Sequence, residues 1–237
     1  MNHDTRSLRR ASLTAGIALA LIIVLALFGA YGAVSALITP GDAGRTAHDI
    51  LGSEGLFRSG IACLFLVVIL DIVVAAALFT VFEPVNRSVS TMAAWFRATY
   101  AAVYLVAISQ LVIALGLLGD PDQALRAVNA YDTIWHVGLI LFGVHLLLLG
   151  LLAYRSDFIP RIFGILLVIA GLGYLADGFA AVLIPDYSMN ISAFTFVGEA
   201  ALMFWLLIKG SRKDFSRREA NRGDQLHPEA LINTSVG

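Results

Sequence analysis

The chain has 237 residues, of which 59% are hydrophobic and 14% charged, and its mean hydropathy is +0.82. Soluble domains carry about a quarter charged residues, and one soluble core cannot absorb this much apolar surface, so the composition predicts an integral membrane protein. The net charge of −1 indicates no nucleic-acid partner, and the single cysteine, Cys63, excludes an internal disulfide framework.

Six stretches are apolar and long enough to cross a bilayer as helices, which takes roughly 20 residues each. They cover approximately residues 11–38, 56–82, 89–119, 133–154, 161–184 and 193–210. The first run exceeds the roughly 7–15 apolar residues of a signal peptide, so we favour a retained span over a cleaved leader. The predicted fold is therefore all-α, with one transmembrane domain over 11–210 between an N-terminal tail (1–10) and a basic, disordered tail (211–237).

Basic residues are distributed unevenly between the two sides of this predicted bundle. Of the 16 lysines and arginines, only Arg45, Arg58 and Arg126 lie in or beside the first, third or fifth connections. The others, Arg97 included, are assigned to the two tails and to the second and fourth connections. Because basic residues favour the cytoplasmic side, we predict that both termini of this multi-pass protein are cytoplasmic.

The two longer outer connections carry helix signals. Asp42 precedes a stretch with helical apolar spacing, and Asp120 with Gln123 forms a capping box around Pro121. We expect a short helix over 42–54 and a helical lead into the fourth span over 120–131. Either segment could lie on the membrane surface, cover a cavity or shield the end of the bundle.

Glycines recur on the fourth and fifth predicted spans. Gly164, Gly171 and Gly178 repeat every seven residues, and Gly143 with Gly150 does the same on the preceding span. Small residues let helix backbones approach closely in membranes, so these two spans should form the tightest hairpin of the bundle.

Polar side chains within the spans are the candidate functional residues, since burying them in hydrocarbon is unfavourable unless they are paired or wetted. Asp71 and His145 lie near the midpoints of their helices, and Gln110, Asp177 and Glu199 lie in the outer halves. Asp177 and Glu199 are on spans joined by a short loop, so they could face each other. Together with Tyr174 and Arg97, they are our candidates for binding a ligand or a proton, in a polar cavity of the outer half.

No catalytic residue or cofactor is predicted. The sequence has no G-x-S-x-G elbow, P-loop or dinucleotide fingerprint. His136 and His145 are nine positions apart, so they point to opposite faces of one helix and cannot share one metal or haem. Each remains only a weak metal candidate by itself, for instance in a zinc site with Asp177 and Glu199.

Several motifs carry a resemblance to a known family. These are FGVHLLLLGLLAYRSDFIPRIFGILLVIAGLGYLADG, then FVGEAALMFWLLIKG, and earlier ILGSEGLFRSGI, the Pro84-Val85-Asn86 turn and Phe96-Arg97. Over residues 12–210 the chain resembles the bacterial domain of unknown function 4386 family. The matching positions are Arg58, Asp71, Asn86, Arg97, His145, Arg155, Pro160, Arg161, Tyr174, Asp177 and Glu199, and His136 is not among them. The resemblance implies a polytopic membrane protein and supplies no activity, substrate or cofactor. We therefore expect a multi-pass protein of a bacterial cytoplasmic (inner) membrane.

Three functional hypotheses follow. The first is transport or sensing of a small molecule, ion or proton through the polar cavity. The second is an intramembrane enzyme, with or without a metal, that uses His145 or His136 with the acids, although the sequence leans away from an enzyme. The third is a non-catalytic partner protein in which the polar residues only fix helix packing. The expected partners are the lipid bilayer and a small ligand, and homo-oligomerisation is left open.

Overall fold

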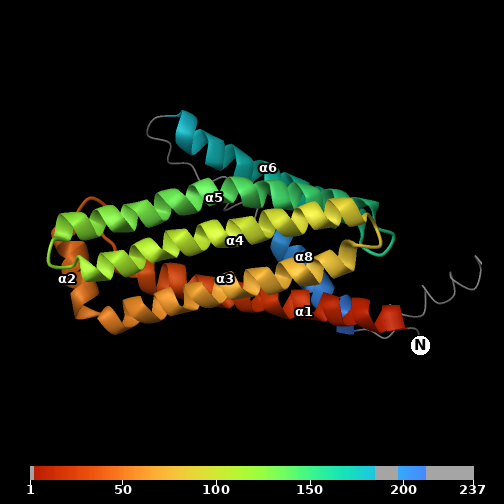
Figure 1. Ribbon diagram of the computed structural model, residues 1–237, viewed down its shortest axis with the longest axis horizontal. Coiled ribbons are helices and arrows are strands. Elements are labelled where there is room, and N and C mark those ends of the chain that lie inside the picture. The colour runs from red at the N-terminus through yellow and green to blue at the C-terminus, as the bar shows by residue number, and fades with distance from the viewer. Residues whose placement is uncertain (1–2, 185–196, 212–237) are drawn as a thin grey trace, which may run out of the picture.

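A computed structural model describes residues 3–184 and 197–211, and this part of the chain contains helices and no strands. Figure 1 shows the long helices lying side by side along one axis. The all-α prediction is therefore confirmed. Within the described residues, five helices are long and apolar enough to cross a membrane.

The N-terminal rod consists of three helical segments in sequence. Helix α1 (His3–Ala26) continues in π-helical geometry as η1 (Leu27–Val34) and ends in the 3₁₀ turn η2 (Ser35–Leu37). A Cβ atom placed on Gly29 would lie 3.0 Å from the carbonyl oxygen of Gly60. The absence of side chains at these two positions therefore lets the π-helical segment touch the next long helix.

Both expected helix starts at the outer connections are confirmed. Helix α2 (Ala43–Gly52) begins after Asp42, whose side chain accepts a 2.9 Å hydrogen bond from the Arg45 N–H. Helix α5 (Pro121–Arg155) begins after Asp120, which accepts bonds from both the backbone and the side chain of Gln123. The lead-in and the fourth predicted span therefore form one continuous helix of 35 residues. Helix α2 packs against α5 and α3 at that end of the bundle.

The remaining helices follow the predicted ranges closely. They are α3 (Glu54–Phe82), α4 (Arg87–Gly116), α6 (Arg161–Leu183) and α8 (Val197–Ser211). Helix α8 corresponds to the sixth predicted span, but its apolar part covers only Gly198–Ile208, and residues 193–196 lie outside the described chain. The structure thus supports five spans by length, and the sixth remains a prediction.

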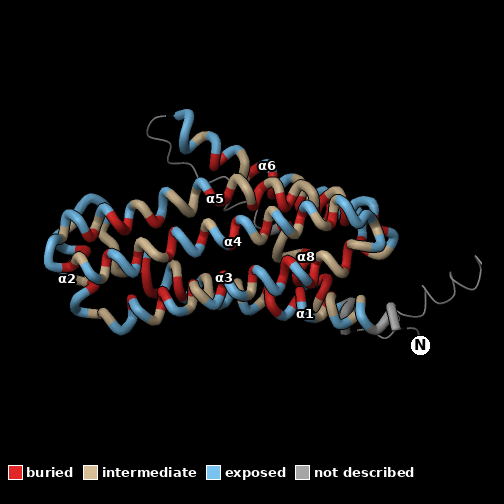
Figure 2. Tube along the Cα trace, in the orientation of Figure 1, coloured by how far each residue is buried: buried red, intermediate tan, exposed pale blue. Residues whose placement is uncertain are grey.

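The helices pack against one another in a closed ring. Helix α1 packs on α3, α3 on α4, α4 on α5, α5 on α6, and α8 contacts both α6 and α1. The buried segments in Figure 2 lie on the helix faces turned toward one another. The α3–α4 turn, the α5–α6 turn and the start of α1 lie at the same end of the bundle (Figure 1).

The predicted glycine contact between α5 and α6 is confirmed. A Cβ atom on Gly171 would lie 2.7 Å from the Gly143 carbonyl oxygen, and one on Gly164 would lie 2.8 Å from that of Gly150. A Cβ atom on Gly178 would collide with Ile140. The two backbones are therefore in contact along most of the hairpin, and α6 is positioned accurately relative to α5.

Candidate functional site

The α3–α4 hairpin positions two of the candidate residues. The side chain of Asn86 caps α4 by accepting a 3.0 Å bond from the Val89 N–H, and Ser90 donates a 3.1 Å bond to the Phe79 carbonyl. Asp71 and Arg97 each lie about 16 Å along their helices from this turn, at 1.5 Å per residue. The hairpin thus brings an acidic and a basic side chain to the same height in the core.

Arg97 is the centre of a buried polar group, which we call the Arg97 cluster and define as Asp71, Arg97 and His145. Arg97 Nη2 donates a 2.5 Å hydrogen bond to Asp71 Oδ1, and Arg97 Nη1 lies 3.3 Å from His145 Nε2. The relative exposures of the three residues are 3%, 3% and 1%. One guanidinium therefore joins α3, α4 and α5 inside the bundle.

The hydrogen bonds determine the tautomer of His145. Its Nδ1 lies 2.8 Å from the carbonyl oxygen of Ala93, which can only accept, so Nδ1 must carry the proton. Arg97 Nη1 can only donate, so Nε2 must be the unprotonated acceptor. His145 is therefore neutral in this arrangement, and a second proton on Nε2 would break its bond to Arg97.

Aromatic rings surround the cluster. The Phe142 ring centroid is 5.3 Å from Arg97 Cζ, in cation–π contact. The same ring contacts those of Tyr100, at 4.8 Å, and Tyr174, at 5.4 Å. These rings keep water away from the charges, so the electrostatic interactions within the cluster are stronger than they would be at a surface.

Glu199, on α8, borders the cluster from the other side of the ring of helices. Its carboxyl group lies near the Tyr174 hydroxyl on α6 and close enough to Arg97 and Asp71 to interact with them electrostatically. Its Oε1 atom is buried without a hydrogen-bond partner, and so is the Nε atom of Arg97. Across the described residues, these are the two buried side-chain polar atoms left without a partner.

Two further candidates lie farther along their helices from the α3–α4 and α5–α6 turns than the Arg97 cluster does. Asp177 follows Tyr174 by one turn on α6 and is buried, with 3% of its surface exposed. Gln110 is half-buried on α4, roughly 20 Å along the helix axis from Arg97. The structure therefore brings Asp71, Arg97, His145, Tyr174 and Glu199 together, and it places Gln110 elsewhere.

The two helical histidines behave as their spacing predicts. His145 is buried, whereas the side chain of His136 is 35% exposed, and its Nδ1 lies 2.8 Å from the Asp132 carbonyl oxygen of its own helix. Within the described ranges, no three His, Cys, Asp or Glu side chains gather closely enough to hold a metal.

The position of Arg97 corrects one interpretation of the sequence. Counting it among the basic residues of the cytoplasmic side was wrong, because its side chain is buried in the core beside Asp71. The sequence held a signal for this position. Arg97 lies ten residues inside an apolar helix, and it is as far from Pro84 in the sequence as Asp71, an acid that needs a counterion.

Comparison with known proteins places the chain in a family. The model described as a domain of unknown function (DUF4386) matches residues 14–210. An uncharacterised protein from Archaeoglobus fulgidus is 35% identical over 149 residues, which are 63% of this chain and 82% of that protein. No solved structure matches the chain. With its apolar helices and a family match over most of its length, this multi-pass membrane protein belongs to the domain of unknown function 4386 family.

Proposed function

We propose that the protein is a proton-linked transport or sensing protein of the cytoplasmic membrane, and that Glu199 and the Arg97 cluster form its proton-responsive centre. The observation that carries this proposal is the pair of unpartnered buried atoms, Arg97 Nε and Glu199 Oε1. One is a donor and the other can accept, and they belong to groups that interact electrostatically.

A purely structural role explains this pair poorly. A buried polar atom without a partner destabilises a protein by about 1–3 kcal/mol, and by more when the group is charged. Asp71 and His145 satisfy only the two Nη atoms of Arg97. The site therefore retains hydrogen-bonding capacity that its present arrangement does not use, which favours a centre with two states.

The second state is reached when Glu199 loses a proton. Loss of a proton from the Glu199 carboxyl leaves a carboxylate whose free oxygen needs a donor in apolar surroundings. Arg97 Nε–H is an unused donor of opposite charge. Formation of an Arg97–Glu199 bond would draw α8 toward α4 and weaken the Arg97 bonds to Asp71 or His145. Protonation of Glu199 would reverse the change.

The groups around Glu199 define what else can titrate. Helix α6 presents Tyr174, with Asp177 one turn farther along, and α4 and α3 present Arg97 and Asp71. Helix α1, which also packs on α8, has Arg9 and Arg10 in its first turns, far along the bundle. Among the described residues, Asp71 already has Arg97 as its cation, whereas no cation lies within 4.0 Å of the Glu199 carboxyl group.

Infrared difference spectroscopy of the protein in lipid, between roughly pH 5 and pH 9, tests the proposal. We expect a protonated-carboxyl band that disappears at high pH and is absent in Glu199→Gln. The matched control is Glu54→Gln, which removes an exposed carboxylate paired with Arg58 at 2.7 Å and should leave the band unchanged. An unchanged band in Glu199→Gln, or no titrating carboxyl in the natural protein, would contradict the proposal.

We also propose that the end of the bundle with the α3–α4 and α5–α6 turns faces the cytoplasm. Arg87, Arg155 and Arg161 lie at this end, as does the start of α1 with Arg9 and Arg10. Arg45, Arg58 and Arg126 lie toward the opposite end. This distribution supports cytoplasmic termini by the positive-inside rule.

A further inference from the structure

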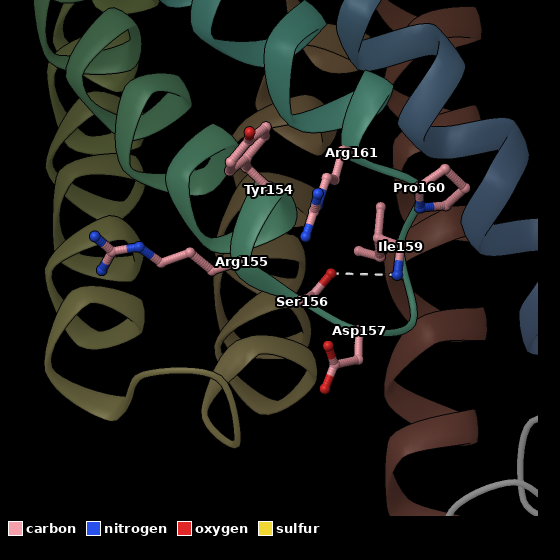
Figure 3. Close-up of a pocket in the computed structure, with 7 residues that line it drawn as sticks. All are labelled: Tyr154, Arg155, Ser156, Asp157, Ile159, Pro160 and Arg161. Atoms are coloured by element: carbon pink, nitrogen blue, oxygen red, sulfur yellow. Dashed lines mark hydrogen bonds between the residues drawn. The ribbon is translucent and has the colours of Figure 1, made fainter.

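The turn between α5 and α6 forms a defined concavity at the basic end of the bundle. A pocket of about 380 Å³ is lined by Tyr154, Arg155, Ser156, Asp157, Ile159, Pro160 and Arg161. Ser156 Oγ donates a 2.8 Å bond to the Ala153 carbonyl and accepts a 3.2 Å bond from the Ile159 N–H, drawn in Figure 3. Because Ser156 and Ile159 are themselves buried, this turn has a fixed shape.

The pocket is lined by two arginines and one aspartate, so its charge is positive overall. Arg45, Arg58, Arg87 and Arg97 each have a carboxylate within 4.0 Å, whereas the structure gives Arg155 and Arg161 none among the described residues. Arg161 lies instead over the Tyr154 ring, with its Cζ atom 5.6 Å from the centroid, and Figure 3 shows the two side chains together. This cation–π contact orients the guanidinium, and because the ring is uncharged it leaves the net positive charge in place.

The other two charged lining residues point away from Arg161. In Figure 3, Arg155 extends to the far side of the α5 terminus, and the Asp157 carboxylate lies at the tip of the turn. Arg161 is thus the cation placed to meet a ligand in the pocket. A guanidinium presents several N–H donors in one plane, a geometry that fits phosphate oxygens.

An apolar surface begins where the pocket ends. On α6, Ile162, Ile165, Ile169 and Leu172 are each about half exposed, on the part of the helix that starts at Arg161. In a membrane this surface faces acyl chains, and exposed Tyr154 has the amphipathic character of an interfacial residue. A charged pocket and an apolar strip therefore adjoin, as the two parts of a phospholipid do.

We propose that the α5–α6 turn binds an anionic phospholipid, with the lipid phosphate at Arg161 and an acyl chain along Ile162 and Ile165. Basic pockets between helices on the cytoplasmic side are suited to anionic headgroups. This site is separate from the Arg97 cluster, and its assignment does not depend on the proposed proton response.

Native mass spectrometry of the detergent-purified protein tests the assignment, with added phosphatidylglycerol or phosphatidylcholine as the probe. We expect phosphatidylglycerol adducts to exceed phosphatidylcholine adducts, and Arg161→Gln to weaken phosphatidylglycerol binding by about fivefold, the factor for one basic side chain at an anionic surface. Arg87→Gln is the control, because Arg87 lies at the same end but is paired with Glu83 at 3.3 Å.

Three outcomes would overturn the assignment. They are equal binding of the two lipids by the natural protein, unchanged phosphatidylglycerol binding in Arg161→Gln, and an equal loss in Arg87→Gln. A further arm adds inorganic phosphate. Displacement of the lipid by millimolar phosphate alone would reassign the pocket to a soluble phosphate compound, whereas retention of the lipid supports a lipid site. Equal thermal unfolding midpoints of the variants show that changes in binding do not reflect misfolding.

Discussion

At the scale of single residues, the decisive feature is that one guanidinium bonds to two partners. Arg97 holds Asp71 at 2.5 Å and His145 at 3.3 Å with all three side chains buried. A buried ion pair of this kind stabilises little overall, because desolvation offsets its attraction, but removing one partner leaves an uncompensated charge. The cluster is therefore sensitive to any change in its proton count, as a responsive centre requires.

Replacing Arg97 by alanine should destabilise the protein by about 3–5 kcal/mol, since Asp71 would keep a buried and unpaired charge. Combining Arg97→Met with Asp71→Leu should recover most of this loss, because both charges are then removed. Thermal unfolding in detergent, at one pH, measures the difference. If Arg97→Ala were as stable as the natural protein, Asp71 would not carry a charge that needs Arg97.

At the scale of the elements, close backbone contact between α5 and α6 sets the position of Tyr174 relative to the cluster. The paired glycines remove the side chains that would separate the helices. In a membrane this packing depends on van der Waals contact, because lipid supplies no hydrophobic force between helices. Tyr174 then reaches both the Phe142 ring and Glu199.

Gly171→Ala should destabilise the hairpin by about 1–3 kcal/mol, since the added methyl group would lie 2.7 Å from the Gly143 carbonyl oxygen, a backbone atom that cannot move alone. Gly116→Ala is the matched control, because nothing lies within 4 Å of its Cβ position. This variant should be neutral or more stable by up to about 1 kcal/mol. The two unfolding midpoints measured side by side decide the matter, and equal midpoints would contradict close packing at Gly171.

At the scale of the whole molecule, the ring of helices has two chemically different ends. Among the described residues, Arg155 and Arg161 at the α5–α6 turn have no carboxylate within 4.0 Å, whereas Arg45 and Arg58 at the other end are each paired with an acid four residues away. The proposed lipid site rests on this difference, whereas the proposed orientation rests on the number of basic residues at each end. The proposed proton-responsive centre lies between the two ends.

Orientation can be measured by cysteine labelling in intact cells after Cys63→Ala removes the native thiol. Asp122→Cys, exposed at the start of α5, should react with a membrane-impermeant reagent. Asp157→Cys, exposed at the α5–α6 turn, should react only after the cells are opened. The reverse pattern would place the termini outside and contradict the proposed orientation.

Much of the architecture follows from the sequence because its causes are local. Apolar length predicts the long helices, Asp42 and Asp120 mark helix starts through their own side chains, and a seven-residue glycine spacing predicts a contact stripe. The opposite faces of His136 and His145 follow from helical rotation alone. None of these inferences requires knowledge of which helices are neighbours.

The Arg97 cluster could not be predicted from the sequence, because it is formed by the packing of three helices. Asp71, Arg97 and His145 come from three helices, and whether their faces meet depends on how each helix rotates and tilts against the next, which periodicity does not specify. For this reason the sequence groups Arg97 with the basic residues of one side and does not predict its bonds to Asp71 and His145, while the facing of Asp177 and Glu199 stays a prediction. By itself the sequence determined that polar groups are buried among these helices, while only the packing of the ring decided which of them share one site.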